Sequence, residues 1–322
     1  MMSRFLSCDW GTSSFRLRLV EAETLQILSE TSTNQGIAAT FSQWQQSDQT
    51  QTSRASFYLN YVQTQIQQMA QRSAAQLEGL PIIFSGMASS SIGIEELPYG
   101  SLPFALDGKG IPCHGIAPTS DFPYPIYLIS GIRSEKDVMR GEETQLLGVF
   151  SQIEVTDDEV LCIFPGTHSK HIWIREQKGI DFQTYMTGEF FDLLSKKSIL
   201  SASVQHHDGF IADAFIKGIE AAKEAPLLQA GFWVRTQQLL GKMNKAANFD
   251  FLSGLLIGSE LKELAVHAAL SIYLCSGSSL SQPYHIALQQ YGFDHVWVLS
   301  DQQMDQAVVR GQYTIYQKML HQ

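Results

Sequence analysis

Two short turns of the same kind, about half of the 322-residue chain apart, constrain the fold more than any other feature. The first turn spans residues 9–12 and reads DWGT, and the second spans residues 164–167 and reads FPGT. Each turn follows an apolar, strand-like run and leads into a second such run. The repeat is one of topology and not of sequence identity. It predicts an α/β chain with two lobes built on the same plan.

The periodicity of apolar residues places further elements around these turns. Strands are expected at residues 5–9, 15–20, 25–29, 81–86 and 126–129, and again at 160–164, 171–174, 180–185, 271–275 and 296–300. Helices are expected at residues 52–73, 141–150, 209–222, 226–243 and 249–266, from residue 279, and at the C-terminal end. The polar stretch 151–159 separates the two series, so we expect one lobe over residues 1–150 and another over residues 151–322.

Charge and composition exclude several classes of partner. The chain carries a formal net charge of −10 and has no block rich in Lys or Arg, so neither nucleic acid nor an anionic membrane is expected as a partner. No signal-peptide pattern is present, and no run approaches the roughly 18 apolar residues of a membrane span. The four cysteines form no CxxC pair and suit reduced thiols. A cytoplasmic protein is therefore expected.

The first turn has the composition of a phosphate-binding turn. Asp9 ends a strand and is followed by Gly11, Thr12 and Ser13. Glycine lets the backbone approach a phosphate, and N–H and hydroxyl groups bind its oxygens, while the aspartate is the expected Mg²⁺ ligand through water. An ordinary hairpin turn favours the same residue types. The second turn, half a chain away, is what favours the phosphate-binding interpretation.

The second turn lacks the acid but adds basic side chains. Gly166 and Thr167 are the expected phosphate-binding residues, and Lys170 is expected to meet a phosphate as a point charge. His168 is expected to form hydrogen bonds or to pack, rather than to act as a base. The adjacent histidines at 206–207 are expected in a solvated loop.

The segment 139–145, which reads MRGEETQ, is the most suggestive for catalysis. Acidic residues are common in the first turn of any helix, because they complement its dipole. This helix, however, lies where the first lobe leads into the second, so its start is expected to face the cleft between them. A kinase needs a carboxylate to accept the proton of the attacking hydroxyl and a cation to bind phosphate or substrate. Glu142 or Glu143 is the expected base, with Arg140 as the cation.

Two strand ends rich in glycine and hydroxyls are candidate ligand sites, because α/β proteins bind ligands at the carboxyl ends of their strands. The residues expected to contact the substrate are Ser85, Gly86, Met87 and Ser89. The residues expected near the nucleoside are Ser276, Gly277 and Ser278, before a helix N-terminus. Walker A, Rossmann and GxSxG patterns are absent from the sequence, which removes three competing classes.

These blocks resemble those of the 2-dehydro-3-deoxygalactonokinase family. The resemblance rests on DWGT at 9–12, MRGEETQ at 139–145, PGTH with Lys170 from residue 165, MTGE at 186–189 and FLSGLLIG at 251–258. They occur in order along nearly the whole chain. The MRGEETQ and PGTH blocks are far more specific than the first turn, which many sugar kinases share.

The resemblance implies a two-lobed actin-like ATPase (ribonuclease H-like) fold with a central cleft. It also implies ATP and Mg²⁺ as cofactors, and phosphorylation of the 6-hydroxyl of 2-dehydro-3-deoxy-D-galactonate in galactonate catabolism. The first lobe would hold the substrate and the first phosphate turn, and the second lobe the adenosine and the second turn. The wider superfamily usually has an aspartate at the second phosphate turn, whereas this chain has Phe164 and Pro165. Asp9 is therefore left as the main metal residue, and Glu189 becomes a second acidic candidate.

Several alternatives remain open at this stage. The substrate carboxylate is expected to meet Arg16 or Arg140. A kinase of another sugar or keto acid, a nucleotide or sugar-acid sensor without catalysis, and a phosphohydrolase share the same implied fold. The substrate epimer is not fixed by the sequence. A homodimer agrees with the frequency of twofold assemblies, but no interface is readable.

Overall fold

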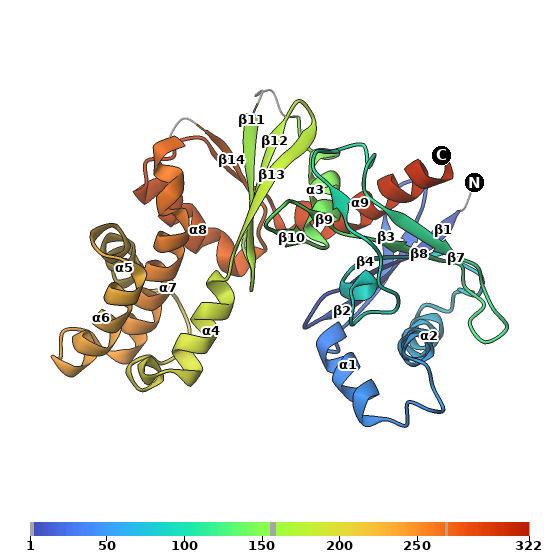
Figure 1. Cartoon of the computed structure of the whole chain (residues 1–322), viewed down its shortest axis with the longest axis horizontal. Helices are drawn as coiled ribbons and strands as arrows, with labels where there is room; N and C mark the ends of the chain where they lie inside the picture. The colour runs from blue at the N-terminus through green and yellow to red at the C-terminus, as the bar shows by residue number, and fades with distance from the viewer. Residues whose placement is uncertain (1–2, 155–158, 268–269, 322) are drawn as a thin grey trace. The chain divides into compact units, whose positions relative to one another are not determined.

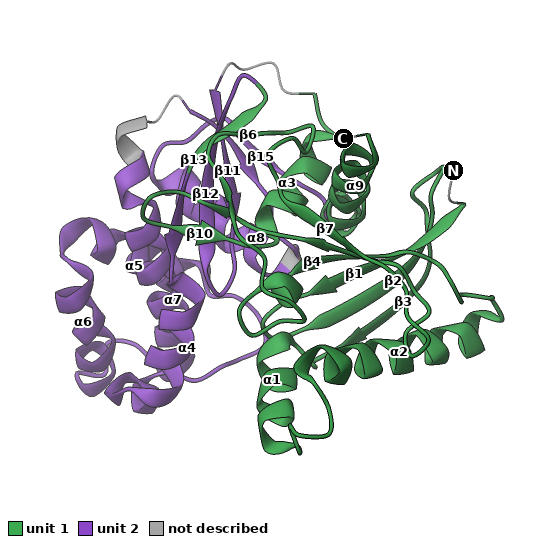
Figure 2. Ribbon diagram, turned by 45° about the vertical axis from the view of Figure 1, so that its right-hand side comes forward, with its two compact units in different colours: residues 1–155, 177–181, 302–322 green, residues 156–176, 182–301 purple. Residues whose placement is uncertain are grey.

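The computed structural model describes residues 3–154, 159–267 and 270–321. The chain forms two compact units (Figure 2). Unit 1 consists of residues 1–155, 177–181 and 302–322, and unit 2 of residues 156–176 and 182–301. The division differs from the expected one at the C-terminal helix, which joins unit 1. Part of the expected joint, residues 155–158, lies outside the described residues.

Unit 1 is built on a sheet with the strand order β3-β2-β1-β4-β8-β7. The strands are β1 (Arg4–Trp10), β2 (Phe15–Glu21), β3 (Ile27–Thr33), β4 (Ile82–Gly86), β7 (Cys113–Ile116) and β8 (Ile126–Ile129). β1 and β2 are antiparallel neighbours, whereas β1, β4 and β8 run parallel. The expected strands of the first half are confirmed, except that the third spans residues 27–33 instead of the expected 25–29. Their continuous apolar runs reflect a sheet that is covered on both faces.

Helices cover the two faces of this sheet (Figure 1). On one face, α2 (Arg54–Ser73) buries Tyr58, Val62, Ile66 and Met69, which follow the helical period and pack into the sheet core. On the other face lies α9 (Asp301–Leu320), whose Tyr313 stacks on Phe5 with ring centroids 5.5 Å apart. The expected helices 52–73 and C-terminal helix are confirmed.

Close packing explains why α9 belongs to unit 1. It crosses α3 (Glu142–Phe150) at small residues: a Cβ atom built on Gly311 would lie 1.8 Å from the carbonyl oxygen of Thr144. The Gln312 side chain also reaches the sheet, because its Nε2 donates to the carbonyl oxygen of Cys8 at 3.0 Å and to Ser85 Oγ at 2.8 Å. The contacts of the helix, rather than its position in the sequence, therefore set the boundary.

The proline-rich region between β4 and α3 contains most of the short strands of unit 1. They are β5 (Gly100–Ser101), β6 (Phe104–Ala105), β9 (Ile132–Arg133) and β10 (Val138–Met139). β10, β9 and β5 form a small sheet of their own. The helix α1 (Ile37–Gln46) was not expected; it is ten residues long and buries only Ile37 and Thr40.

Unit 2 repeats the plan of unit 1 in its sheet. The strands are β11 (Glu159–Phe164), β12 (Ser169–Arg175), β13 (Lys178–Tyr185), β14 (Ser271–Leu274) and β15 (Val296–Val298), and of β13 only residues 182–185 belong to unit 2. Their order is β15-β14-β11-β12-β13, with β11 antiparallel to β12 and parallel to β14. The corresponding order in unit 1 is β8-β4-β1-β2-β3. The two glycine–threonine turns therefore join equivalent pairs of strands, as the sequence predicted.

The rest of unit 2 is largely helical. Its helices are α4 (Thr187–Lys197), α5 (Ala212–Glu224), α6 (Leu227–Leu239), α7 (Lys245–Leu261) and α8 (Ser278–Gln290). α5 and α7 approach closely, since a Cβ atom on Gly254 would lie 2.0 Å from the carbonyl oxygen of Phe215. Among the described residues, no helix combines the length and apolarity that crossing a bilayer requires.

Candidate nucleotide and substrate sites

The first turn is held by the start of α1. The Gly11 N–H donates to the carbonyl oxygen of Ser14 at 2.9 Å, which closes the turn. The carbonyl oxygens of Gly11 and Thr12 accept hydrogen bonds from Ile37 N (3.0 Å) and Ala38 N (3.1 Å). Thr12 and Ser13 are exposed. The turn is thus fixed from behind, while its hydroxyl groups face solvent.

Three of the expected motifs meet at the carboxyl end of β1 and β4. Asp9 pairs in register with Ser85, at the end of the neighbouring strand. A Cβ atom on Gly86 would lie 3.4 Å from Asp9 Oδ1, and one on Gly141 would lie 3.4 Å from the Gly86 Cα atom. Gly86 and Gly141 have φ angles of +79° and +116°, which disfavour any side chain. The start of α3 therefore lies against the end of β4, beside Asp9.

Two carboxylates interact electrostatically here. Burial raises the pKa of Asp9 above its usual value, and the charges of Arg18 and Arg16 partly offset this rise. The charge of Glu142 raises the pKa of Asp9 further. A cation placed near Asp9 and Glu142 would relieve this repulsion. Within the described ranges, no group of three or more His, Cys, Asp or Glu side chains is arranged to hold a metal ion alone.

The two glutamates at the start of α3 differ in their surroundings. Glu143 is fully buried, and its carboxylate accepts hydrogen bonds from Gly141 N (2.9 and 2.8 Å) and Thr144 Oγ1 (3.0 Å). Burial raises its pKa to about 7, with a further contribution from Glu142. Glu142 is only partly buried, and its Oε2 accepts a hydrogen bond from Arg140 N at 3.1 Å. Glu143 thus caps its own helix, whereas Glu142 is accessible to solvent.

Arg140 is held against the interior of unit 1. Its Nη1 donates to the carbonyl oxygen of Ser89 at 2.6 Å and to Ser89 Oγ at 2.5 Å, and its guanidinium carbon lies 4.2 Å from the centre of the Tyr99 ring. Arg16 instead forms ion pairs with Glu30 at 3.8 Å and Asp305 at 3.4 Å. Of the two candidate cations for the substrate, Arg140 therefore has the more rigid setting.

The hydroxyls of two expected substrate residues are bonded within unit 1. Ser89 is buried and donates to the carbonyl oxygen of Ile129 at 2.6 Å. Ser85 is buried and accepts the hydrogen bond from Gln312. Gly86 is also buried, whereas Met87 is partly exposed. Ser85 and Gly86 thus lie beside Asp9, and Ser89 bonds Arg140, while Met87 has the most accessible side chain of the four.

The second turn packs on the start of α4. The Glu189 N–H donates to the carbonyl oxygen of Thr167 at 3.0 Å, and a Cβ atom on Gly188 would lie 2.5 Å from the carbonyl oxygen of Gly166. His168 Nε2 lies 2.5 Å from Glu189 Oε2, which agrees with the expected hydrogen-bonding role of this histidine. Thr167 is exposed, whereas Lys170 is only 5 % exposed.

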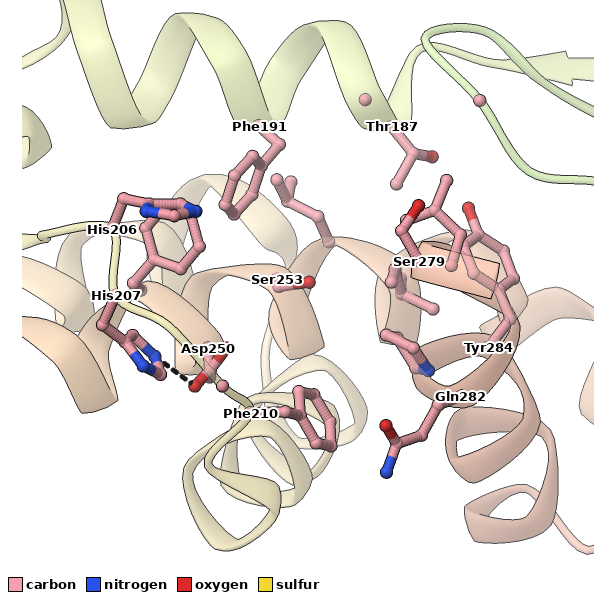
Figure 3. A pocket seen from close by; sticks show the side chains of 18 of the residues that line it. Thr187, Phe191, His206, His207, Phe210, Asp250, Ser253, Ser279, Gln282 and Tyr284 are labelled. Carbon is pink, nitrogen blue, oxygen red and sulfur yellow. Dashed lines mark hydrogen bonds and ion pairs between the residues drawn. The ribbon is translucent and has the colours of Figure 1, made fainter. Parts of the chain in front are cut away.

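A pocket of about 560 Å³ opens beside this turn (Figure 3). It is lined by Gly166, Thr187, Gly188, Phe191, His206, His207, Asp208, Gly209, Phe210, Phe249, Asp250, Ser253, Leu256, Ile257, Ser279, Leu280, Gln282, Pro283 and Tyr284. Aromatic and aliphatic side chains form much of its wall. His207 Nε2 contacts Asp250 Oδ2 at 2.9 Å, so the wall also carries a fixed polar pair. Its lining suits an apolar group with a few polar edges.

The residues expected near the nucleoside, Ser276, Gly277 and Ser278, are not among the residues that line this pocket. Its lining on this side comes instead from the first turns of α8: Ser279, Leu280, Gln282, Pro283 and Tyr284. The histidines at 206–207 also line the pocket, although a solvated loop was expected; His206 is exposed, but the His207 side chain is only 19 % exposed. No local motif marks these residues. Their position before α5 and beside aromatic residues was the only available signal.

Comparisons with known proteins find relatives that match most of the chain. The family model described as 2-keto-3-deoxy-galactonokinase matches residues 9–315. The 2-dehydro-3-deoxygalactonokinase of Escherichia coli K12 is 34 % identical over 231 residues, which cover 70 % of this chain and 75 % of that protein. A crystal structure from Sinorhizobium meliloti, of a protein assigned as a 2-dehydro-3-deoxygalactonokinase, aligns with a TM-score of 0.77 and 31 % identity over 98 % of this chain and 96 % of that one.

A more distant structure bears on the fold alone. The activator of 2-hydroxyisocaproyl-CoA dehydratase from Clostridium difficile, solved with bound ADPNP, aligns with a TM-score of 0.51 and 10 % identity. The alignment covers 99 % of this chain and 96 % of that one. The fold is therefore the α/β fold of actin-like ATPases with two sheet-based lobes, as expected from the sequence.

Proposed function

Because the chain belongs to the 2-keto-3-deoxy-galactonokinase family, we propose that it is a sugar-acid kinase that uses ATP to phosphorylate the 6-hydroxyl of 2-dehydro-3-deoxy-D-galactonate. The observation that carries the proposal is the family match, which extends over residues 9–315 and includes both glycine–threonine turns. The reaction belongs to galactonate catabolism. The residue roles below are proposals that the geometry of each unit supports.

The pocket of unit 2 is the proposed adenosine site. Its apolar wall, which includes Phe210, Phe249 and Leu256, suits the faces of a purine ring. Gly166 lines the same pocket, so a nucleoside bound there would direct its phosphates toward the second turn. The exposed Thr167 then offers its N–H and hydroxyl groups to phosphate oxygens. Lys170 contributes positive charge close to the turn rather than an exposed ammonium group.

The first turn and Asp9 are the proposed phosphate and metal residues of unit 1. Gly11, Thr12 and Ser13 present backbone and hydroxyl groups on a turn that α1 holds in place. Asp9 would hold Mg²⁺ through water. Glu142 is near enough for its charge to raise the pKa of Asp9, so the cation would attract both carboxylates. When bound, Mg²⁺ neutralises negative charge on the phosphate groups.

Glu142 is the proposed general base, because it is the accessible carboxylate at the start of α3. It would accept the proton of the attacking hydroxyl. Glu143 is fully buried and uses both oxygens to cap the helix, so its proposed role is to orient that turn. Arg140 is the proposed partner of the substrate carboxylate, because its side chain is held in one position by Ser89 and Tyr99.

A kinase assay with coupled detection of ADP tests the proposal. ATP and Mg²⁺ are supplied with 2-dehydro-3-deoxy-D-galactonate, its gluconate epimer, or a panel of other sugars and keto acids. We expect turnover to be highest with the galactonate compound. Preference for another member of the panel would assign a different substrate within the same class of kinase. ATP binding without turnover would indicate a sensor, and phosphate release without an acceptor would indicate a hydrolase.

A further inference from the structure

One buried carboxylate, which does not itself line the pocket of unit 2, is hydrogen-bonded to three of the elements around that pocket and the second turn. Glu260 lies in the last turn of α7, and its side chain is 1 % exposed. It accepts four hydrogen bonds, from Ser169 Oγ (2.7 Å), His171 Nε2 (2.8 Å), Thr187 Oγ1 and Tyr284 OH (2.7 Å). The two hydrogen bonds on Oε1 come from β12, and the two on Oε2 come from α4 and α8.

These donors belong to the elements that surround the second turn. Ser169 follows Thr167 by two residues, at the start of β12. Thr187 begins α4 and Tyr284 lies on α8, and both line the pocket, although Glu260 does not. Figure 3 shows Thr187 and Tyr284 at the same end of the pocket, opposite His206 and His207. One carboxylate therefore joins the turn to two walls of the pocket.

The energetics favour a rigid arrangement. A buried carboxylate is costly unless hydrogen bonds satisfy it, and an ionised carboxylate has about four acceptor positions. Burial alone raises the pKa of Glu260, but the hydrogen bond from His171 and its charge, with the hydrogen bonds from Thr187 and Ser169, outweigh this and leave the pKa below its usual value. Glu260 is therefore ionised at neutral pH, and moving any one donor leaves part of a buried charge unsatisfied.

We propose that Glu260 is a positioning residue for the nucleotide phosphates: it fixes the turn at Gly166 and Thr167 against the pocket, so that the phosphate-binding groups are in place before ATP arrives. This inference rests on the proposed kinase function. Glu260 does not line the pocket and acts through the four side chains that donate to it, of which Ser169 and His171 lie next to the turn. Its expected effect is on binding of the β-phosphate, which the turn would contact, rather than on binding of the adenosine.

Two variants separate this role from general stability. Glu260→Gln places an amide NH₂ against one pair of donors and removes the charge. Ser169→Ala removes a single hydrogen bond to Glu260 without changing a residue that lines the pocket. It provides the test if the Glu260→Gln variant does not fold. The matched control is Tyr291→Phe. It removes a hydroxyl that donates to the carbonyl oxygen of Gly258 at 2.8 Å. Gly258 lies on α7, as Glu260 does, and neither Tyr291 nor Gly258 lines the pocket.

The test measures the dissociation constants of ADP and AMP by calorimetry on the full chain, with thermal melting as the measure of stability. In wild-type protein ADP should bind more tightly than AMP, because it carries the β-phosphate. Glu260→Gln should weaken ADP binding by about tenfold, and Ser169→Ala by somewhat less, with AMP binding changed less than about twofold. Tyr291→Phe should lower the melting temperature without changing the ratio of the two constants.

Two results would overturn the inference. An unchanged ratio of ADP to AMP affinity in Ser169→Ala and in any folded Glu260→Gln would show that the cluster only stabilises unit 2. Wild-type protein that bound neither nucleotide would remove the kinase proposal and the role of Glu260 with it. Because the first result requires a wild-type protein that binds ADP, the two failures are distinguishable.

Discussion

Both carboxylate oxygens of Glu143 accept a hydrogen bond from the backbone N–H of Gly141, with N···O distances of 2.9 and 2.8 Å. The side chain thereby satisfies an N–H group at the start of its own helix. It does so while fully buried, and burial raises its pKa from 4.5 to about 7. The group that orders the start of α3 therefore changes charge near neutral pH.

This raised pKa predicts a pH-dependent stability. Between pH 4.5 and about 7 the folded protein holds a proton on Glu143 that the unfolded chain has lost. The free energy of unfolding should therefore be highest below this window and should fall as the pH rises through it, by up to about 3 kcal/mol. Glu143→Gln should remove this component. Urea unfolding of both proteins at pH 5, 6, 7 and 8 measures it, and parallel pH profiles would show that the carboxyl titrates normally.

The two glutamates should also separate kinetically. Glu142→Gln should lower kcat by about a hundredfold or more, because it removes the proposed proton acceptor. Glu143→Gln keeps an oxygen that can accept from Gly141 N, so kcat should fall by less than about tenfold. Steady-state assays at saturating ATP and substrate measure both. Near wild-type kcat in Glu142→Gln, together with a large loss in Glu143→Gln, would exchange the two roles.

Asp9→Asn tests the metal role. The amide keeps the shape of the side chain but loses the charge, so kcat should fall by about a hundredfold while the melting temperature changes little. Activity should also require more Mg²⁺ for half-saturation. The control is Asp107→Asn, which removes an exposed ion pair with Lys318 elsewhere in unit 1 and should leave kcat unchanged. Turnover above about a tenth of wild type in Asp9→Asn would contradict the role.

Local patterns in the sequence predicted the sheets well, because strand runs and turns are encoded over a few residues. The pairing of β1 with β2 and of β11 with β12 follows directly from the two turns. Helix α1 escaped prediction, because it is short and its first residues are fixed by non-local hydrogen bonds: Ile37 N and Ala38 N donate to the first turn. Likewise, α9 lies in unit 1 because of its contacts with α3 and Ser85.

The residues of the candidate site were predictable from the sequence only where they belong to one short, continuous motif. The meeting of Asp9, Gly86 and Gly141 joins three motifs that the sequence had singled out. The pocket of unit 2 draws its lining from α4, α7, α8 and the segment before α5, so no short pattern contains it. Glu260 is a single acid at the end of an apolar helix, and only the folded chain shows the four donors around it.

A substitution at Gly188 that adds a single methyl group tests the role of the second turn. A Cβ atom there would lie 2.5 Å from the carbonyl oxygen of Gly166 and 2.8 Å from the Thr167 Cα atom, so the turn must move. Both contacts are with backbone, which cannot rotate away as a side chain can. Gly188→Ala should therefore raise KM for ATP by about tenfold or more, with a smaller change in KM for the sugar acid.

The matched control for Gly188→Ala is Gly231→Ala. Gly231 lies inside α6, and a Cβ atom there would meet nothing within 4 Å. Alanine has the higher helix propensity, so this variant should be more stable by up to about 1 kcal/mol and kinetically unchanged. Steady-state kinetics with varied ATP and thermal melting measure both variants. If Gly188→Ala lost stability but kept its KM for ATP, the turn at Gly166 and Thr167 would not be binding the phosphates.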